Sequence, residues 1–248
     1  MKPDIDSLIS YEDAHIIVCR KPAGIPTQTA RVSEQDMVSL LKNHLGAAGH
    51  RQEHAASGSI EHPSAPYLAV IHRLDQPVEG LLVFAKTPAA AKDLNRQLNT
   101  SGFGKYYRAV VCGIPNPREG TLEDYLVKDG RTNTSRVCGK NTPGAKHARL
   151  HYRVEEICRD TEPVTSLVHI RLDTGRHHQI RVQMAHLGCP LAGDRKYGAQ
   201  EPRNANGTAV SKHTGAQEPL KKAGALRLCA YRLEFTHPKS GKQMIYEL

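Results

Sequence analysis

An arginine and an aspartate stand two residues apart in the motif HRLDQPVEG, residues 72–80. Residues two apart on an extended segment point to the same side, so Arg73 and Asp75 could share one cleft. The apolar run at 81–85 predicts a buried strand directly after them. Taken alone, the Arg-x-Asp pattern is more typical of an ion pair at a turn, which contributes little to stability.

A second group of cationic side chains lies about a hundred residues downstream, and its members are Arg171, Arg176, Arg181, His177, His178 and His186. The spacing of Ile180, Met184 and Leu187 predicts a helix that begins near Gly175. Free backbone N–H groups at its first turn, beside these cations, predict a phosphate site, with a solvated basic face as the alternative. No acidic residue completes a zinc-binding motif with the histidines, so we expect no metal site.

The composition suggests a polyanionic partner. The chain has 34 Lys and Arg residues against 25 Asp and Glu residues, a net charge of +9. Nucleic acid is therefore the first candidate, although many basic proteins bind no particular anion. No apolar segment has the length of a signal peptide or a membrane span, so we expect a cytoplasmic protein without membrane contact. The six cysteines form no C-x-x-C pair and are expected to be reduced thiols.

The elements that must position these residues are mostly strands. Apolar runs or alternating patterns predict strands at 15–19, 67–71, 81–85, 106–112, 149–154 and 167–172. A helix is predicted at 88–99, with Thr87 as its N-cap and Pro88 in its first turn, and another at 36–45. Strands that are grouped in this way indicate an α+β fold with a mixed, mostly antiparallel sheet. Three polar stretches, 47–65, 129–147 and 199–224, are predicted as loops.

Several motifs in order resemble the RluA-type pseudouridine synthases. They are YEDAHIIVCRKPAGIPTQ at 11–28, HRLD at 72–75, KYYRA at 105–109, TGRHHQIRVQMAHLG at 174–188, GDRKYG at 193–198 and LCAYRLEFTHP at 228–238. Such an ordered set is far more specific than any single motif. The resemblance implies one catalytic domain over 1–248 with a central cleft, without the N-terminal RNA-binding domain of many relatives. The stretches 47–65 and 199–224 are then expected to be mobile insertions that select the RNA.

The resemblance also implies a reaction, in which uracil is detached from C1′ of a uridine in RNA, turned, and rejoined through C5. Asp75 matches the catalytic aspartate, which must be ionised to act as a nucleophile toward either the sugar or the base. Arg181 matches the arginine that keeps it ionised, with Arg176 as the nearest alternative. Tyr107 matches the tyrosine that stacks on the target base, although such a residue would otherwise be read as structural.

Other roles follow from the same resemblance. Arg73 is expected to reach into the space left by the flipped nucleotide, and its contacts would offset the cost of flipping. Leu74 and Leu233 are expected to line the uracil pocket, with an ordinary core leucine as the stronger alternative for Leu233. Arg176, His177 and His178 are expected to bind RNA. The partner would be structured ribosomal or transfer RNA, and we expect a monomer that needs neither metal nor cofactor.

The chain departs from the family pattern at three places. Val78-Glu79-Gly80 stands where Thr-Ser-Gly is usual, His177 where threonine is common, and Gln183 where histidine is common. Glu79 would raise the pKa of Asp75 if both faced one cleft, but we expect it to face solvent or an arginine. Two rival functions follow: an RNA-binding protein without turnover, and a glycoside-cleaving enzyme that uses Asp75 and Glu79 as a carboxylate pair.

Overall fold

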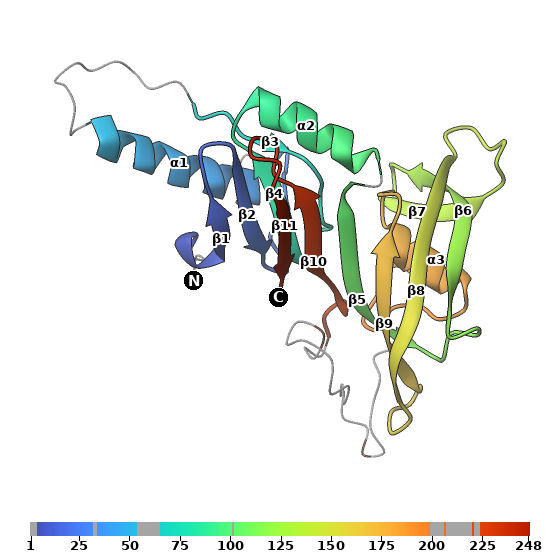
Figure 1. Cartoon of the computed structure of the whole chain (residues 1–248). Helices are drawn as coiled ribbons and strands as arrows, with labels where there is room; N and C mark the ends of the chain where they lie inside the picture. The colour runs from blue at the N-terminus through green and yellow to red at the C-terminus, as the bar shows by residue number, and fades with distance from the viewer. Residues whose placement is uncertain are drawn as a thin grey trace. The chain divides into compact units, whose positions relative to one another are not determined.

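The computed structural model describes residues 4–31, 34–53, 65–100, 102–198, 206, 220 and 224–248, with the side chains of 48–53 left out. The chain forms two compact units (Figure 1). Unit 1 comprises Met1–Phe103 and Leu233–Leu248, and unit 2 comprises Gly104–Arg232. A single domain over 1–248 stays a prediction. Within the described ranges, no helix is long and apolar enough to span a membrane.

Unit 1 is a small sheet with helices. Its elements are η1 (Asp6–Leu8), β1 (Ile9–Glu12), β2 (Ile16–Lys21), α1 (Met37–Glu53), β3 (Ala69–Val70), β4 (Glu79–Ala85), α2 (Pro88–Leu98), β11 (Gln243–Glu247) and the end of β10 (Leu228–Thr236). The strand order is β1-β2-β4-β10, with β3 on β4 and β11 on β10. Strands β2 and β4 are antiparallel, from Ile16 opposite Ala85 to Lys21 opposite Gly80.

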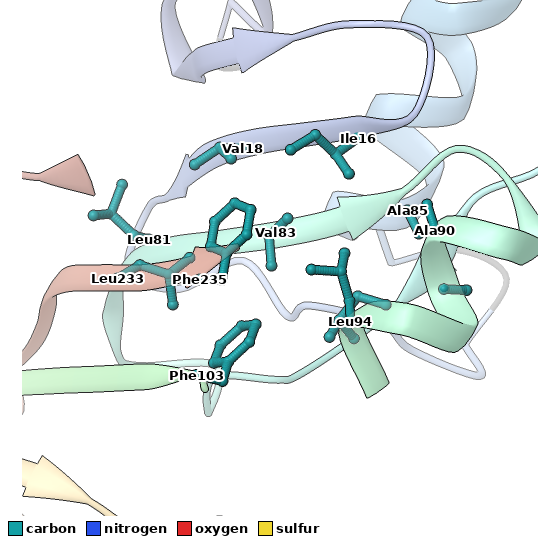
Figure 2. Close-up of a cluster of buried hydrophobic side chains, with 12 residues drawn as sticks. Ile16, Val18, Leu81, Val83, Ala85, Ala90, Leu94, Phe103, Leu233 and Phe235 are labelled. Carbon is teal, nitrogen blue, oxygen red and sulfur yellow. The ribbon is translucent and has the colours of Figure 1, made fainter. Parts of the chain in front are cut away.

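The core of unit 1 lies between this sheet and α2 (Figure 2). The rings of Phe103 and Phe235 stack with centroids 5.8 Å apart. Leu94 of α2 is fully buried against them, as the helical spacing predicts. The predicted cap is confirmed, because the Thr87 hydroxyl accepts a hydrogen bond from the backbone N–H of Ala90.

Among its described residues, unit 2 is an antiparallel sheet with one helix. Its elements are β5 (Gly104–Cys112), β6 (Glu119–Asp129), β7 (Thr134–Cys138), β8 (Lys146–Cys158), β9 (Thr165–Leu172), α3 (Gln179–His186) and the start of β10. The strand order is β10-β5-β9-β8-β6-β7. Helix α3 packs against β6 and β7 (Figure 1). The two units confirm the predicted α+β class with a mostly antiparallel sheet.

Helix α3 begins later than predicted. It starts at Gln179 rather than near Gly175, because His178 has a left-handed backbone with φ of 54°. Arg176 precedes the helix, and its N–H donates to the side-chain oxygen of Gln179. The residues that were expected to form the first helical turn therefore lie in the loop before it, and the argument from free N–H groups at 175–178 was wrong.

Two of the three stretches predicted as loops contain regular secondary structure among their described residues. Helix α1 continues to Glu53, into the stretch predicted as a loop at 47–65, and residues 54–64 lie outside the described part of the chain. The stretch 129–147 contains β7, since β6 and β7 form a hairpin. Most of 199–224 also lies outside the described residues. Mobility of the two insertions stays a prediction.

Candidate catalytic loop and basic site

Asp75 lies in the loop between β3 and β4 and is half-buried. Its carbonyl oxygen accepts a hydrogen bond from the N–H of Val78 at 3.0 Å, which makes residues 75–78 a turn. The preceding residue, Leu74, is held through both backbone groups by the buried hydroxyl of Thr27, each at 3.1 Å. The chain on the N-terminal side of Asp75 is therefore anchored to a distant segment of unit 1.

Lys21 anchors the other side of Asp75. Its side chain is fully buried, and its ammonium donates to the carbonyl oxygens of Pro22, Ile25 and Gln76 at 3.0, 2.7 and 3.1 Å. Burial lowers the pKa of Lys21 to about 8, against the opposing effect of the Asp75 and Glu79 carboxylates. Since Gln76 follows Asp75 directly, Lys21 and Thr27 together hold both neighbours of the predicted catalytic residue.

Glu79 is engaged by an arginine. It forms an ion pair with Arg20 on the neighbouring strand β2. This confirms the expectation that Glu79 would face solvent or an arginine. Val78, the other departure in this motif, is buried, and the backbone φ of Gly80 is 145°, a value that favours glycine. The altered motif therefore supplies an apolar contact and an ion pair at the start of β4.

The other predicted residues of unit 1 differ in exposure. Arg73 is exposed, so its side chain is accessible to a ligand. Leu74 is buried. Leu233 is 2% exposed and packs in the core beside Phe235 (Figure 2), which fits the alternative of a core leucine. The assignment of both leucines to a uracil pocket stays a prediction.

Arg181 of unit 2 forms a buried ion pair with Asp194. The guanidinium donates from Nε and Nη2 to the two carboxylate oxygens at 2.8 and 2.7 Å, and both side chains are almost fully buried. Burial raises the pKa of Asp194, but the bonds from Arg181 and from two backbone N–H groups outweigh it and hold the pKa below its ordinary value. Asp194 follows Gly193, where any side chain would collide with the carbonyl of Ala225.

The two histidines before α3 belong to the same cluster as Arg181. The His178 ring is buried, and its Nδ1 lies 2.7 Å from the hydroxyl of Tyr197, whose ring faces the Arg181 guanidinium at 5.1 Å. Burial and the nearby Arg181 lower the pKa of His178 to about 3, so this ring is neutral near pH 7. His177 stacks on it and bonds to the Ser135 hydroxyl at 2.8 Å. A cationic contact to RNA is thus not supported for His178.

The predicted site residues divide between the two units. Unit 1 holds Arg73, Leu74, Asp75 and Leu233, and unit 2 holds Tyr107, Arg176, His177, His178 and Arg181. Tyr107 is 7% exposed on β5, opposite Ile170 of β9. Pairing of Arg181 with Asp75 and stacking of a base on Tyr107 stay predictions, as does the central cleft. In the described ranges, no three His, Cys, Asp or Glu side chains are grouped to hold a metal ion.

Sequence reasoning missed four supporting residues, namely Lys21, Thr27, Asp194 and Tyr197. Two signals could have found Lys21 and Asp194. A lysine beside Pro-x-Gly at the end of an apolar strand suggests a buried cation that needs backbone acceptors. A buried arginine on a helix needs a carboxylate, and the nearby motif GDRKYG supplies one.

Most of the chain is similar to one family of proteins. A sequence model described as RNA pseudouridylate synthase matches residues 15–186. Ribosomal large subunit pseudouridine synthase D of Nitrosomonas europaea is 33% identical over 240 residues, which cover 96% of this chain and 60% of that protein. The protein of the same name from Pseudomonas aeruginosa is 33% identical over 250 residues, which cover 98% and 68%.

A solved structure agrees with these relatives. The structure of human RNA pseudouridylate synthase domain containing 4 has a TM-score of 0.65 to this chain and 22% sequence identity. The match covers 98% of this chain and 88% of the human one. At this identity the likeness concerns the fold alone. The chain spans 57% to 69% of the length of these curated relatives. The matched length and identity establish that the chain belongs to the RNA pseudouridylate synthase family.

Proposed function

We propose that the chain is an RNA pseudouridine synthase with Asp75 as its catalytic carboxylate. One observation carries the proposal beyond family membership: the half-buried Asp75 stands on a loop whose residues on both sides are tied down by Thr27 and Lys21. A nucleophile must be held in a reactive orientation, and a small displacement lowers the rate strongly. Such anchoring is expected of a catalytic carboxylate more than of a surface ion pair.

The proposed reaction breaks the N1–C1′ bond of the uridine and forms a C5–C1′ bond. C5 loses its hydrogen as a proton and N1 gains one, so atoms and electrons balance, and the proposal includes no metal and no cofactor. Asp75 supports the anomeric carbon or adds to the base, and Arg181 holds it ionised. A guanidinium has five N–H donors, and the pair with Asp194 uses two of them while orienting the rest. Tyr107 stacks on the uracil, and Arg73 helps to flip it out.

The substrate we propose is ribosomal RNA of the large subunit, with transfer RNA as the alternative. Relatives that are about one third identical carry the name ribosomal large subunit pseudouridine synthase D. A net charge of +9 fits an RNA partner of either kind. We place the reaction in the cytoplasm and propose that a monomer performs it.

The test is release of tritium from RNA that contains 5-tritiated uridine, measured with ribosomal and transfer RNA pools. We expect release from ribosomal RNA, since the new bond replaces the C5 hydrogen. Asp75→Asn should keep the fold and RNA affinity of the wild type and form no product above background. Turnover that persists in Asp75→Asn would show that Asp75 is not the catalytic carboxylate.

Two further outcomes would favour the rivals. Free uracil as the product would indicate a glycoside-cleaving enzyme. Tight RNA binding by a folded wild-type protein without release from either pool would indicate an RNA-binding protein without turnover.

A further inference from the structure

Lys105 is a buried cation on the same face of β5 as Tyr107. It is only 7% exposed, and residues 105, 107 and 109 alternate as the buried positions at the start of this strand. Residues two apart on one strand face are separated by about 7 Å. The Lys105 side chain therefore starts about 7 Å from that of the tyrosine predicted to hold the target base, on the same strand face.

The Lys105 ammonium forms no hydrogen bond or ion pair with any residue that the structure describes. The carboxylate whose charge acts on it, Asp173, is already paired with Arg149, His151 and Arg171 at 3.4, 2.8 and 3.2 Å. Gly175 leaves room beside the ammonium, since a Cβ there would stand 3.6 Å from Nζ. Nζ is not one of the fully enclosed polar atoms, so the ammonium reaches the surface at the end of a buried side chain. A poorly solvated ammonium without an acceptor points to a ligand that supplies one.

Arg176 adds a second cation at this place. Its Nε donates to the carbonyl oxygen of His147 at 2.7 Å, and its guanidinium forms no ion pair within the described ranges. Burial lowers the pKa of Lys105 to about 8, and repulsion from Arg176 adds to the effect while Asp173 opposes it. Two like charges that repel each other in a poorly solvated place are stabilised by an anion between them.

We propose that Lys105 and Arg176 together bind one backbone phosphate of the RNA, close to the nucleotide that enters the site at Tyr107. An ammonium and a guanidinium are the side chains best suited to a phosphate, the first as a compact charge and the second as a planar fork of donors. This inference rests on the proposed function and identifies a contact that would set the position of the RNA strand, independently of the bond-making step at Asp75.

The first test compares Lys105→Met with Lys128→Met, which removes the same charge from an exposed position on β6. Each variant is assayed for RNA binding at several salt concentrations and for tritium release. Lys105→Met should weaken binding and raise KM at least about tenfold, and lower the slope of log affinity against log salt by about 0.7, the value for one phosphate on a single strand. Lys128→Met should leave both close to the wild type.

Stability separates this role from a structural one. Methionine has a similar length and no charge, so Lys105→Met should keep or raise the melting temperature, because an unpaired buried charge is removed. A folded Lys105→Met protein whose affinity and salt slope match those of Lys128→Met would overturn the proposal. So would a melting temperature that falls below that of Lys128→Met, since this would make Lys105 structural.

A second test changes the RNA instead of the protein. Single methylphosphonates, which remove the charge of one phosphate, are placed at each position around the modified uridine. One position should weaken binding of the wild type at least about tenfold and have little further effect on Lys105→Met. No such position would overturn the proposal. Because the wild type must first release tritium from the unmodified RNA, failure of the proposed function is seen before this comparison begins.

Discussion

Two lysines, one in each unit, are buried to nearly the same degree but differ in what faces the ammonium. Lys21 is fully buried and donates to three carbonyl oxygens. Lys105 is 7% exposed and has no acceptor in the part of the chain that the structure describes. Burial lowers the pKa of both to about 8. Similar burial therefore does not mean a similar role.

The presence or absence of acceptors around the ammonium distinguishes a structural lysine from one that is available to a ligand. A buried polar group contributes to stability when its hydrogen bonds are made and costs free energy when they are not. Lys21 donates to Pro22 and Ile25 of its own segment and to Gln76 beside Asp75, so it ties the loop that carries the predicted chemistry to β2. Lys105 leaves its bonds unmade, as expected of a group that gains its partner only when RNA binds.

Lys21→Met gives the largest effect. The carbonyl oxygens of Pro22 and Ile25 would lose the Lys21 donor, while that of Gln76 would keep the N–H of Gly24. Each buried unpaired acceptor costs about 1 to 3 kcal/mol, partly offset by removal of the buried charge. We expect the free energy of unfolding in urea to fall by about 3 kcal/mol and kcat to fall at least about tenfold, because the Asp75 loop loosens. Lys105→Met is the matched control and should show no loss of stability. Equal losses of stability in the two variants would show that Lys21 and Lys105 do not differ in role.

The dependence of stability on pH gives the next largest effect. The ordinary pKa of lysine is 10.5, and that of folded Lys21 is about 8. Between these values the unfolded chain binds more protons, so the Lys21 contribution to the free energy of unfolding rises with pH, by on the order of 3 kcal/mol. The gap between the wild type and Lys21→Met should therefore widen from pH 8 to 10.5. A constant gap would show that the pKa of Lys21 is not lowered.

Glu79→Gln should give the smallest effect. Its carboxylate supports the charge of Lys21 and pairs with Arg20, whose side chain is 46% exposed. An ion pair exposed on one side contributes less than about 1 kcal/mol. We expect the free energy of unfolding to change by less than this and tritium release to stay within about threefold of the wild type. Loss of all activity in Glu79→Gln would instead support the carboxylate-pair alternative.

Much of the fold could be predicted from local sequence patterns. The helix predicted at 88–99 and its Thr87 cap are confirmed, with the helix ending one residue earlier at Leu98, since capping and helical spacing act within a few residues. The start of α3 was not, because the left-handed His178 depends on contacts with Tyr197 and other residues beyond the helix. Strand β7 was missed for a similar reason: a short polar hairpin is stabilised by its pairing with β6, which its composition does not reveal.

The sequence by itself determined the family, the order of its motifs and the residues that can carry chemistry, because these depend on residue type and spacing along the chain. The tertiary structure alone decided which charges are buried and what each of them faces. Lys21 meets Gln76 55 residues later, and Arg181 meets Asp194 on a loop beyond its own helix. Burial and partners are set by segments distant in the chain, and they distinguish a lysine that anchors a loop from one that remains available for a phosphate.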